Sequence, residues 1–290
     1  MTAERRKALL PWGLLAPGLL WLVIFFAVPL YYMIQISLKE GTLDTGYQFT
    51  WHLQNYSDAL SHYDDQFLRS FWYAGLSTVI CLVVGYPLAY FIAFRGGKWK
   101  NALLLLVILP FFTTYLVRTL SWQTILDDDG WVVDFLRTIG VLKSDGRILA
   151  TSGAVIAGIT YNFLPFMILP LYASLERIDH RLVEAANDLY GRRRDVLRRV
   201  VIPLSMPGIV AGVLLTFIPA AGDFINAKLL GTPQQTMIGN VIQSRYLVLN
   251  DYPTATALSL MLMLVILVMV LVYARFAGTE SLTGAEEEPA

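Results

Sequence analysis

Long apolar stretches separated by short polar segments are the dominant pattern of this sequence. Each stretch is long enough to cross a bilayer core of about 30 Å as a helix, which takes about 20 residues. The pattern therefore predicts an all-α integral membrane protein with six transmembrane helices. The predicted spans are residues 10–34, 71–94, 101–125, 150–175, 205–227 and 255–277.

Eight prolines lie within or at the ends of these spans, where neighbouring helices can satisfy the freed backbone groups. We therefore expect kinked helices that pack against one another. The first span follows Arg5, Arg6 and Lys7, an arrangement shared with signal peptides, but it is longer than a typical signal-peptide core and no small-residue cleavage site follows. The prolines are Pro11, Pro17, Pro29, Pro87, Pro110, Pro165, Pro170 and Pro219.

The distribution of Lys and Arg between alternate loops predicts the orientation, because these residues are retained on the cytoplasmic side. With the N-terminus inside, the inner segments hold fourteen Lys and Arg residues and the outer segments seven. Both termini are then cytoplasmic. We expect a short N-terminal segment (1–9), a single membrane domain (10–278) containing an inner loop at 176–204, and an acidic tail (279–290).

Composition agrees with a membrane class and excludes several others. Hydrophobic residues make up 56% of the chain, charged residues 15%, and the formal net charge is zero. A nucleic-acid partner is therefore not expected. The single cysteine, Cys81, excludes an internal disulfide framework, and three scattered histidines argue against a metal centre. Gly96-Gly97-Lys98 lacks the spacing of a phosphate-binding loop, so ATP binding by this chain is not expected.

The inner loop carries the most informative pattern in the chain. Its first half alternates apolar and charged residues at helical spacing, which predicts an amphipathic helix, and a basic helix is expected from Arg192 to Val201. Two short helices meeting near Gly191 could seat in a groove of a partner protein. An interfacial segment held to anionic lipid by its arginines remains the alternative.

Within this loop, Glu184-Ala185-Ala186 followed by Ile202-Pro203 resembles the EAA loop of permeases of binding-protein-dependent ABC importers. The resemblance extends to further segments, which are similar to the PotB-type subunit of spermidine/putrescine importers. It implies a MetI-like type I importer permease whose coupling loop lies between the fourth and fifth spans. The similar segments are GYPLAYFIAF (85–94), ILPFFTTYLVRTLSW (108–122), LPFMILPLYASLERID (164–179) and IPLSMPGIVAG (202–212).

The resemblance also implies partners and a division of labour. A cytoplasmic ATPase dimer would bind ATP and Mg²⁺, so this chain would hold no cofactor and catalyse no reaction. A second, PotC-like permease would complete the pore, and an extracytoplasmic binding protein would deliver a polyamine. The ATPase-coupling residues carried over are Glu184, Ala185, Ala186, Asp188 and Gly191. Tyr190-Gly191 and Val200 depart from the family pattern, which weakens the assignment of Gly191.

Ionisable residues inside spans are candidates for a translocation path, because they are costly in lipid. Arg118 and Asp223 are the two candidates, and Tyr115, Trp122 and Tyr161 could attract a polyamine through cation–π contacts. An ion pair between Arg118 and Asp223 could hold the outer gate shut. The alternatives are that Arg118 extends to the outer surface and that Asp223 caps a helix.

Two further questions stay open at this level. Gly208 and Gly212 form a small-xxx-small pattern, expected to pack within the subunit rather than at a dimer seam.

A permease for another small solute of the same importer class is the nearest alternative function. A secondary transporter is less favoured, because neither inverted repeats nor broken helices with ion ligands are apparent, and a membrane enzyme would need a convergent catalytic set.

Overall fold

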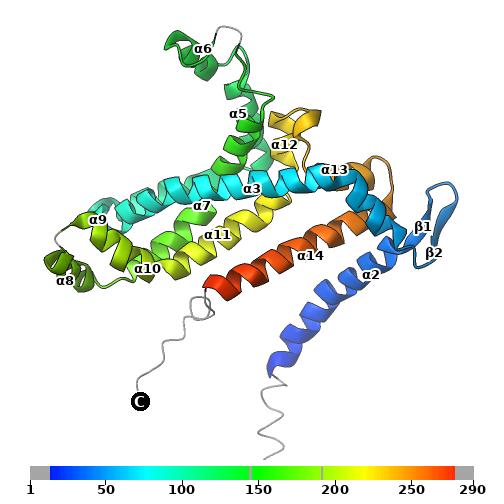
Figure 1. The fold of residues 1–290 in the computed structure, drawn as a ribbon, viewed down its shortest axis with the longest axis horizontal. Coiled ribbons are helices and arrows are strands. Elements are labelled where there is room, and N and C mark those ends of the chain that lie inside the picture. The colour runs from blue at the N-terminus through cyan, green and yellow to red at the C-terminus, as the bar shows by residue number, and fades with distance from the viewer. Residues whose placement is uncertain (1–13, 144–145, 191, 278–290) are drawn as a thin grey trace, which may run out of the picture. The chain divides into compact units, whose positions relative to one another are not determined.

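The computed structural model describes residues 14–143, 146–190 and 192–277, and these are helical apart from turns and one short hairpin (Figure 1). The first helix, Leu14–Ser37, includes the π-helical turn η1 (Val23–Ala27) and α2 (Val28–Ser37). The remaining helical elements are α3 (Gln54–Arg95), η2 (Gly97–Trp99), α4 (Lys100–Ile108), η3 (Leu109–Phe112), α5 (Tyr115–Leu126), α6 (Trp131–Thr138), α7 (Ser152–Glu176), α8 (His180–Tyr190), α9 (Arg193–Val196), η4 (Leu197–Val201), α10 (Ile202–Leu204), α11 (Met206–Ala221), α12 (Ile225–Leu230), η5 (Pro233–Gln235), α13 (Ile238–Leu247) and α14 (Tyr252–Ala277).

Four of the described helices are long and apolar enough to cross a membrane without interruption. They are Leu14–Ser37, Gln54–Arg95, Ser152–Glu176 and Tyr252–Arg275. Two further candidates are broken: the helices on either side of Thr113-Thr114 meet at 93°, and those on either side of Ser205 meet at 67°. The described residues therefore offer four spans, or six where each bent pair counts as one.

Of the described residues, 14–64 and 242–263 form one compact unit. Its hairpin pairs β1 (Lys39–Thr42) with β2 (Gly46–Phe49) in antiparallel register, Lys39 opposite Phe49. The Tyr47 hydroxyl donates a hydrogen bond to the Asn250 carbonyl, and the Tyr47 and Tyr252 rings lie 5.6 Å apart. These contacts attach the hairpin to the turn that precedes α14.

The second unit is formed by the described residues of 65–241 and by 264–277, and its core is built around α7. α11 packs along α7 through Gly208 and Gly212. A Cβ atom at Gly208 would lie 2.5 Å from Ser174 Cβ and 2.7 Å from the Pro170 carbonyl oxygen, closer than real Cβ atoms come to other heavy atoms. The expectation that this glycine pair packs within the subunit is confirmed.

Candidate functional site

The segment between α7 and α11 folds into two short helical stretches. Asp179 directly precedes the first of them, α8, and its Oδ1 accepts a hydrogen bond from the Arg181 amide at 2.9 Å, an amide that the helix itself leaves free. Ala186 is buried, whereas Glu184, Ala185 and Asp188 are exposed. The α8 helix therefore offers one polar face with a small residue at its edge. Gly191 lies outside the described residues.

An open groove of about 440 Å³ lies between α8 and the helical stretch that follows it. The small side chains of Ala185 and Ala186 leave this space free, while Leu182 and Leu189 at its margin are 52% and 80% exposed. Exposed large apolar side chains gathered around a groove are typical of a surface that another molecule covers. The lining residues are Leu182, Ala185, Ala186, Leu189, Arg199, Val200, Pro203 and Leu204.

The start of this segment is attached to α4. The Lys100 ammonium, in the first residue of α4, pairs with the Glu176 carboxylate in the last residue of α7. The ammonium also lies 5.3 Å from the centre of the Tyr172 ring. The pair therefore joins the end of α7 to the start of α4, and α4 leads towards the 93° bend before α5.

The breaks in the helices bring together a group of buried polar side chains. Asp223 lies between α11 and α12, where Gly222 ends α11 as its cap residue. Its Oδ1 accepts the Asn226 amide at 2.9 Å, so it caps α12. Its Oδ2 accepts hydrogen bonds from the Tyr115 hydroxyl and from Asn226 Nδ2, the latter at 3.1 Å. The capping role considered for Asp223 is thus confirmed, and Tyr115 and Asp223 lie together.

Three polar residues that the sequence did not single out extend this cluster. Asn226 Nδ2 donates to the Tyr115 hydroxyl at 2.6 Å, and its Oδ1 accepts from Asn162 Nδ2 at 3.2 Å. Asn162 Nδ2 also donates to the Thr119 hydroxyl at 3.3 Å. A buried amide such as Asn162 in the middle of an apolar span was the available signal, because such a group needs a partner. The cluster joins α5, α7 and α12.

Arg118 and Asp223 do not form the ion pair considered for a closed outer gate in this conformation. The reason is that Asp223 is held by Tyr115 and Asn226. The Arg118 guanidinium instead lies over the rings of Phe111 and Tyr115, 5.5 Å and 5.7 Å from their centres. It is 8% exposed and therefore does not extend to the surface.

The other two aromatic candidates form a pair of their own. Trp122 on α5 and Tyr161 on α7 pack edge to face with ring centres 5.4 Å apart. The sequence showed no broken helices bearing ion ligands, and as to the breaks themselves this expectation was wrong, because two helix pairs are bent by 93° and 67°. Neither bend is at Asp223, which follows the end of α11. Three-dimensional contacts at prolines and short polar breaks decide such bends, and hydropathy alone does not detect them.

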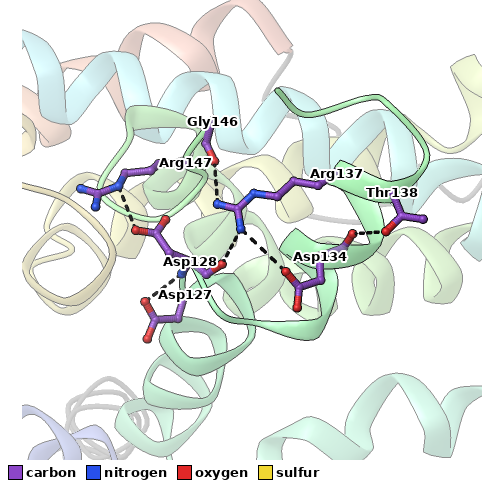
Figure 2. Close-up of polar contacts among 7 residues, drawn as sticks. All are labelled: Asp127, Asp128, Asp134, Arg137, Thr138, Gly146 and Arg147. Atoms are coloured by element: carbon purple, nitrogen blue, oxygen red, sulfur yellow. Dashed lines mark hydrogen bonds and ion pairs between the residues drawn. The ribbon is translucent and has the colours of Figure 1, made fainter. Parts of the chain in front are cut away.

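The segment between α5 and α7 carries charged residues whose side chains contact one another and the backbone (Figure 2). Arg137 on α6 donates hydrogen bonds to the Asp128 and Gly146 carbonyl oxygens at 2.8 Å and 3.3 Å. Arg147 Nε pairs with the Asp128 carboxylate at 2.8 Å, and Thr138 bonds the Asp134 carbonyl. Both arginines contact the loop's own backbone or carboxylates, and Arg147 remains 71% exposed.

Replacing Arg137 by methionine should loosen this loop more than replacing Arg147 by methionine. Arg137 satisfies two backbone carbonyls, so its loss should cost about 1–3 kcal/mol. Arg147 is 71% exposed, and exposed ion pairs contribute about 0–1 kcal/mol. Hydrogen exchange of residues 127–149 measures the difference. Equal protection in the two variants would contradict the ranking.

Comparison with known proteins places these features in a family. Residues 85–278 match the family described as binding-protein-dependent transport system inner membrane component. The spermidine/putrescine transport system permease protein PotB of Haemophilus influenzae is 38% identical over 80% of this chain and 82% of its own length. PotB of Escherichia coli K12 is 39% identical over 80% of this chain and 85% of its own length.

Among solved structures, the fold is similar to a chain of a bacterial alginate ABC transporter in complex with an alginate pentasaccharide-bound periplasmic protein. The TM-score is 0.71 with 19% identity, and the match covers 97% of this chain and 98% of the other. At that identity the likeness concerns the fold alone.

Proposed function

Since the chain belongs to the binding-protein-dependent transport system inner membrane component family and is a multi-pass permease subunit of the inner membrane, we propose that it imports polyamines. The importer would be ATP-driven, with spermidine or putrescine as cargo. Identity of 38–39% to PotB proteins supports this cargo over another small solute of the same importer class. The structural observation that supports a coupling role is that α8 is exposed and lies beside an open groove.

In this proposal α8 is the coupling helix that docks on a cytoplasmic ATPase dimer. The ATPase would hold ATP and Mg²⁺, and this chain would bind neither. Ala185 permits close approach of the partner, while Glu184 and Asp188 are exposed and can accept hydrogen bonds from it. Movement of α8 would reach α4 through the end of α7, because Glu176 of α7 pairs with Lys100 of α4.

The proposed topology has six spans with both termini in the cytoplasm, each bent helix pair counting as one crossing. Residues 1–9 and 279–290 would be the cytoplasmic ends of the chain. A second, PotC-like permease would supply the other half of the pore, and an extracytoplasmic binding protein would deliver the cargo to the outer loops. The relation to a transporter solved with its periplasmic protein supports this assembly at the level of the fold.

The proposed path for the cargo passes the break at Asp223. Tyr115, Trp122 and Tyr161 present aromatic faces that attract ammonium groups, and the Asp223 carboxylate adds a negative charge. Asp223 is satisfied by protein donors in this conformation, so a passing ammonium would have to replace one of them. The path is thus closed at this point until the cluster rearranges.

A secondary transporter is the second candidate, because the two broken helices are a feature of that class. The candidates differ in their energy source and in their partners. Gentle detergent purification of the tagged protein from its own membranes, followed by mass spectrometry, tests both. An ATPase and a second permease should accompany the chain. A chain that is isolated alone and imports cargo on an ion gradient would contradict the proposal.

Replacing Ala185 by leucine should uncouple the transporter, because the new side chain enters the groove and blocks close approach of the ATPase. Loss of an interface contact of this kind weakens binding by about 1–4 kcal/mol, or at least about fivefold. Asn187→Leu is the matched control, since Asn187 is exposed on the same helix and does not line the groove. The measurement is the amount of ATPase that co-purifies with each variant, together with polyamine uptake into proteoliposomes. Equal loss in both variants would argue against the groove.

A further inference from the structure

The helical stretch Arg193–Leu204, made of α9, η4 and α10, carries exposed positive charge together with its cap residue. Four arginine side chains are exposed and make no ion pair or hydrogen bond with the part of the chain that the structure describes. The only acidic residue within positions 192–204 is Asp195. The four arginines are Arg192, Arg193, Arg194 and Arg198. Their charge is therefore available to a molecule outside the chain.

The direction of this stretch differs from that of the helix it precedes. Arg193–Leu204 meets Met206–Ala221, which includes all of α11, at 67°. Membrane-spanning helices are tilted by about 20° on average from the bilayer normal. With α11 crossing at such a tilt, the preceding stretch runs closer to the membrane plane than to the normal. Arg198 also lies only about 12 Å of helix before the start of α11, so the geometry keeps the four arginines near the membrane surface.

The two sides of the stretch differ in chemistry. Val196 and Val201 are 3% and 1% exposed and belong to the same core cluster as Leu175 of α7. The four arginines lie on the sides that this core does not cover. A helix that lies along a membrane surface with exposed arginines is attracted to anionic headgroups. The planar guanidinium group can also bind phosphate oxygens through two parallel hydrogen bonds.

An acidic surface of the ATPase is the other candidate partner for the four arginines. In the proposed function the ATPase is bound by α8, whose exposed polar residues include the carboxylates Glu184 and Asp188. The four arginines follow α8 and lead directly into the membrane-crossing helix. This position favours the membrane surface as their partner.

We propose that the four arginines bind the phosphate groups of anionic phospholipids in the cytoplasmic leaflet and hold the stretch Arg193–Leu204 along the membrane surface. The inference rests on the proposed function in that it places this loop in the cytoplasm. Because α8 contacts α9 and η4, the lipid contact also fixes the position from which α8 docks on the ATPase. Import should therefore depend on the anionic lipid content of the membrane.

Lipid retention tests the contact directly. The transporter, purified with its partner subunits, is placed in nanodiscs of equal parts phosphatidylcholine and phosphatidylglycerol, and the lipids that stay bound on release are counted by native mass spectrometry. Wild-type protein should retain phosphatidylglycerol in preference to phosphatidylcholine. Replacing the four arginines by glutamine should lower this preference at least about fivefold, which is the contribution of about one basic residue near an anionic surface. Equal preference in wild type and variant would overturn the proposal.

Two further variants control for folding and for general surface charge. Replacing the four arginines by lysine keeps the charge and should keep most of the preference. Arg181→Gln removes an arginine that is exposed on α8, outside the basic stretch, and should leave the preference unchanged. An equal loss with Arg181→Gln would contradict a contact specific to the stretch. A glutamine variant that loses the ATPase but keeps the lipid preference would overturn the proposal in favour of a protein partner.

Uptake into proteoliposomes separates this inference from the proposed function. Wild-type import should be faster with phosphatidylglycerol than with phosphatidylcholine alone, and the glutamine variant should lose this difference. A wild-type preparation without an ATPase overturns the proposed function, while the lipid counts still decide the role of the four arginines. An ATP-driven importer whose lipid retention does not change in the glutamine variant overturns the lipid contact alone.

Discussion

Replacing Asp223 by alanine is expected to abolish transport and to lower the stability of the subunit. The change leaves the Tyr115 hydroxyl, the Asn226 amide and Asn226 Nδ2 without their shared acceptor. Each buried donor left unsatisfied costs about 1–3 kcal/mol, and a domain has only about 5–15 kcal/mol of stability in total. Uptake into proteoliposomes and thermal unfolding of the purified transporter measure the two effects.

A graded series separates the carboxylate from the rest of the cluster. Asp223→Asn keeps one acceptor oxygen and should be less damaging to stability than Asp223→Ala. Tyr115→Phe removes one donor and one acceptor while retaining the ring, so its effect on unfolding should be smaller again, about 1 kcal/mol. An Asp223→Ala variant that unfolds at the wild-type temperature would show that the cluster does not hold the broken helices together.

Replacing Gly208 by alanine should produce the second large effect, through packing alone. The added methyl group would lie 2.5 Å from Ser174 Cβ and 2.7 Å from the Pro170 carbonyl oxygen. The α7 backbone cannot move aside locally, so α11 must shift, at a cost of about 1–3 kcal/mol. Thermal unfolding and the amount of folded subunit in the membrane measure the result.

Two other glycines provide matched comparisons for this change. A Cβ atom at Gly212 would meet the Met167 sulfur at 2.7 Å, an atom in a flexible side chain, so Gly212→Ala should be milder. At Gly75 in α3 nothing lies within 4 Å, and alanine there should be neutral or stabilise the protein by about 0.4–1 kcal/mol. Equal destabilisation at Gly208 and Gly75 would contradict close α7–α11 packing as the cause.

The two predictions concern different physical requirements at neighbouring parts of the second unit. The glycine pair allows α11 to approach α7 closely, and the polar cluster then fixes α12 and α5 against α7 beyond the end of α11. Packing therefore brings the helices together, and hydrogen bonding determines where they break. A transport cycle that rearranges the cluster can leave the glycine contact in place.

Several features of the candidate site could be predicted from sequence because they depend on local chemistry. The alternation of charged and apolar residues after Glu176 predicts α8, and Pro219 with Gly222 predicts the end of α11 before Asp223. The Tyr115–Asp223 contact could not be predicted in the same way. It joins residues 108 positions apart, and only the 93° turn before α5 brings the hydroxyl to the carboxylate.

The sequence by itself determined the medium, the helical class and the family, because apolar length and the Glu184-Ala185-Ala186 loop are properties of continuous stretches of chain. Only the tertiary structure decided that two candidate spans are broken, that Asp223 is held by Tyr115 and Asn226, and that Arg118 is left without an anion. The reason is physical, because the hydropathy of a segment measures only how favourably that segment transfers into lipid. The pairing of buried polar groups with one another depends on contacts between helices that are distant in sequence.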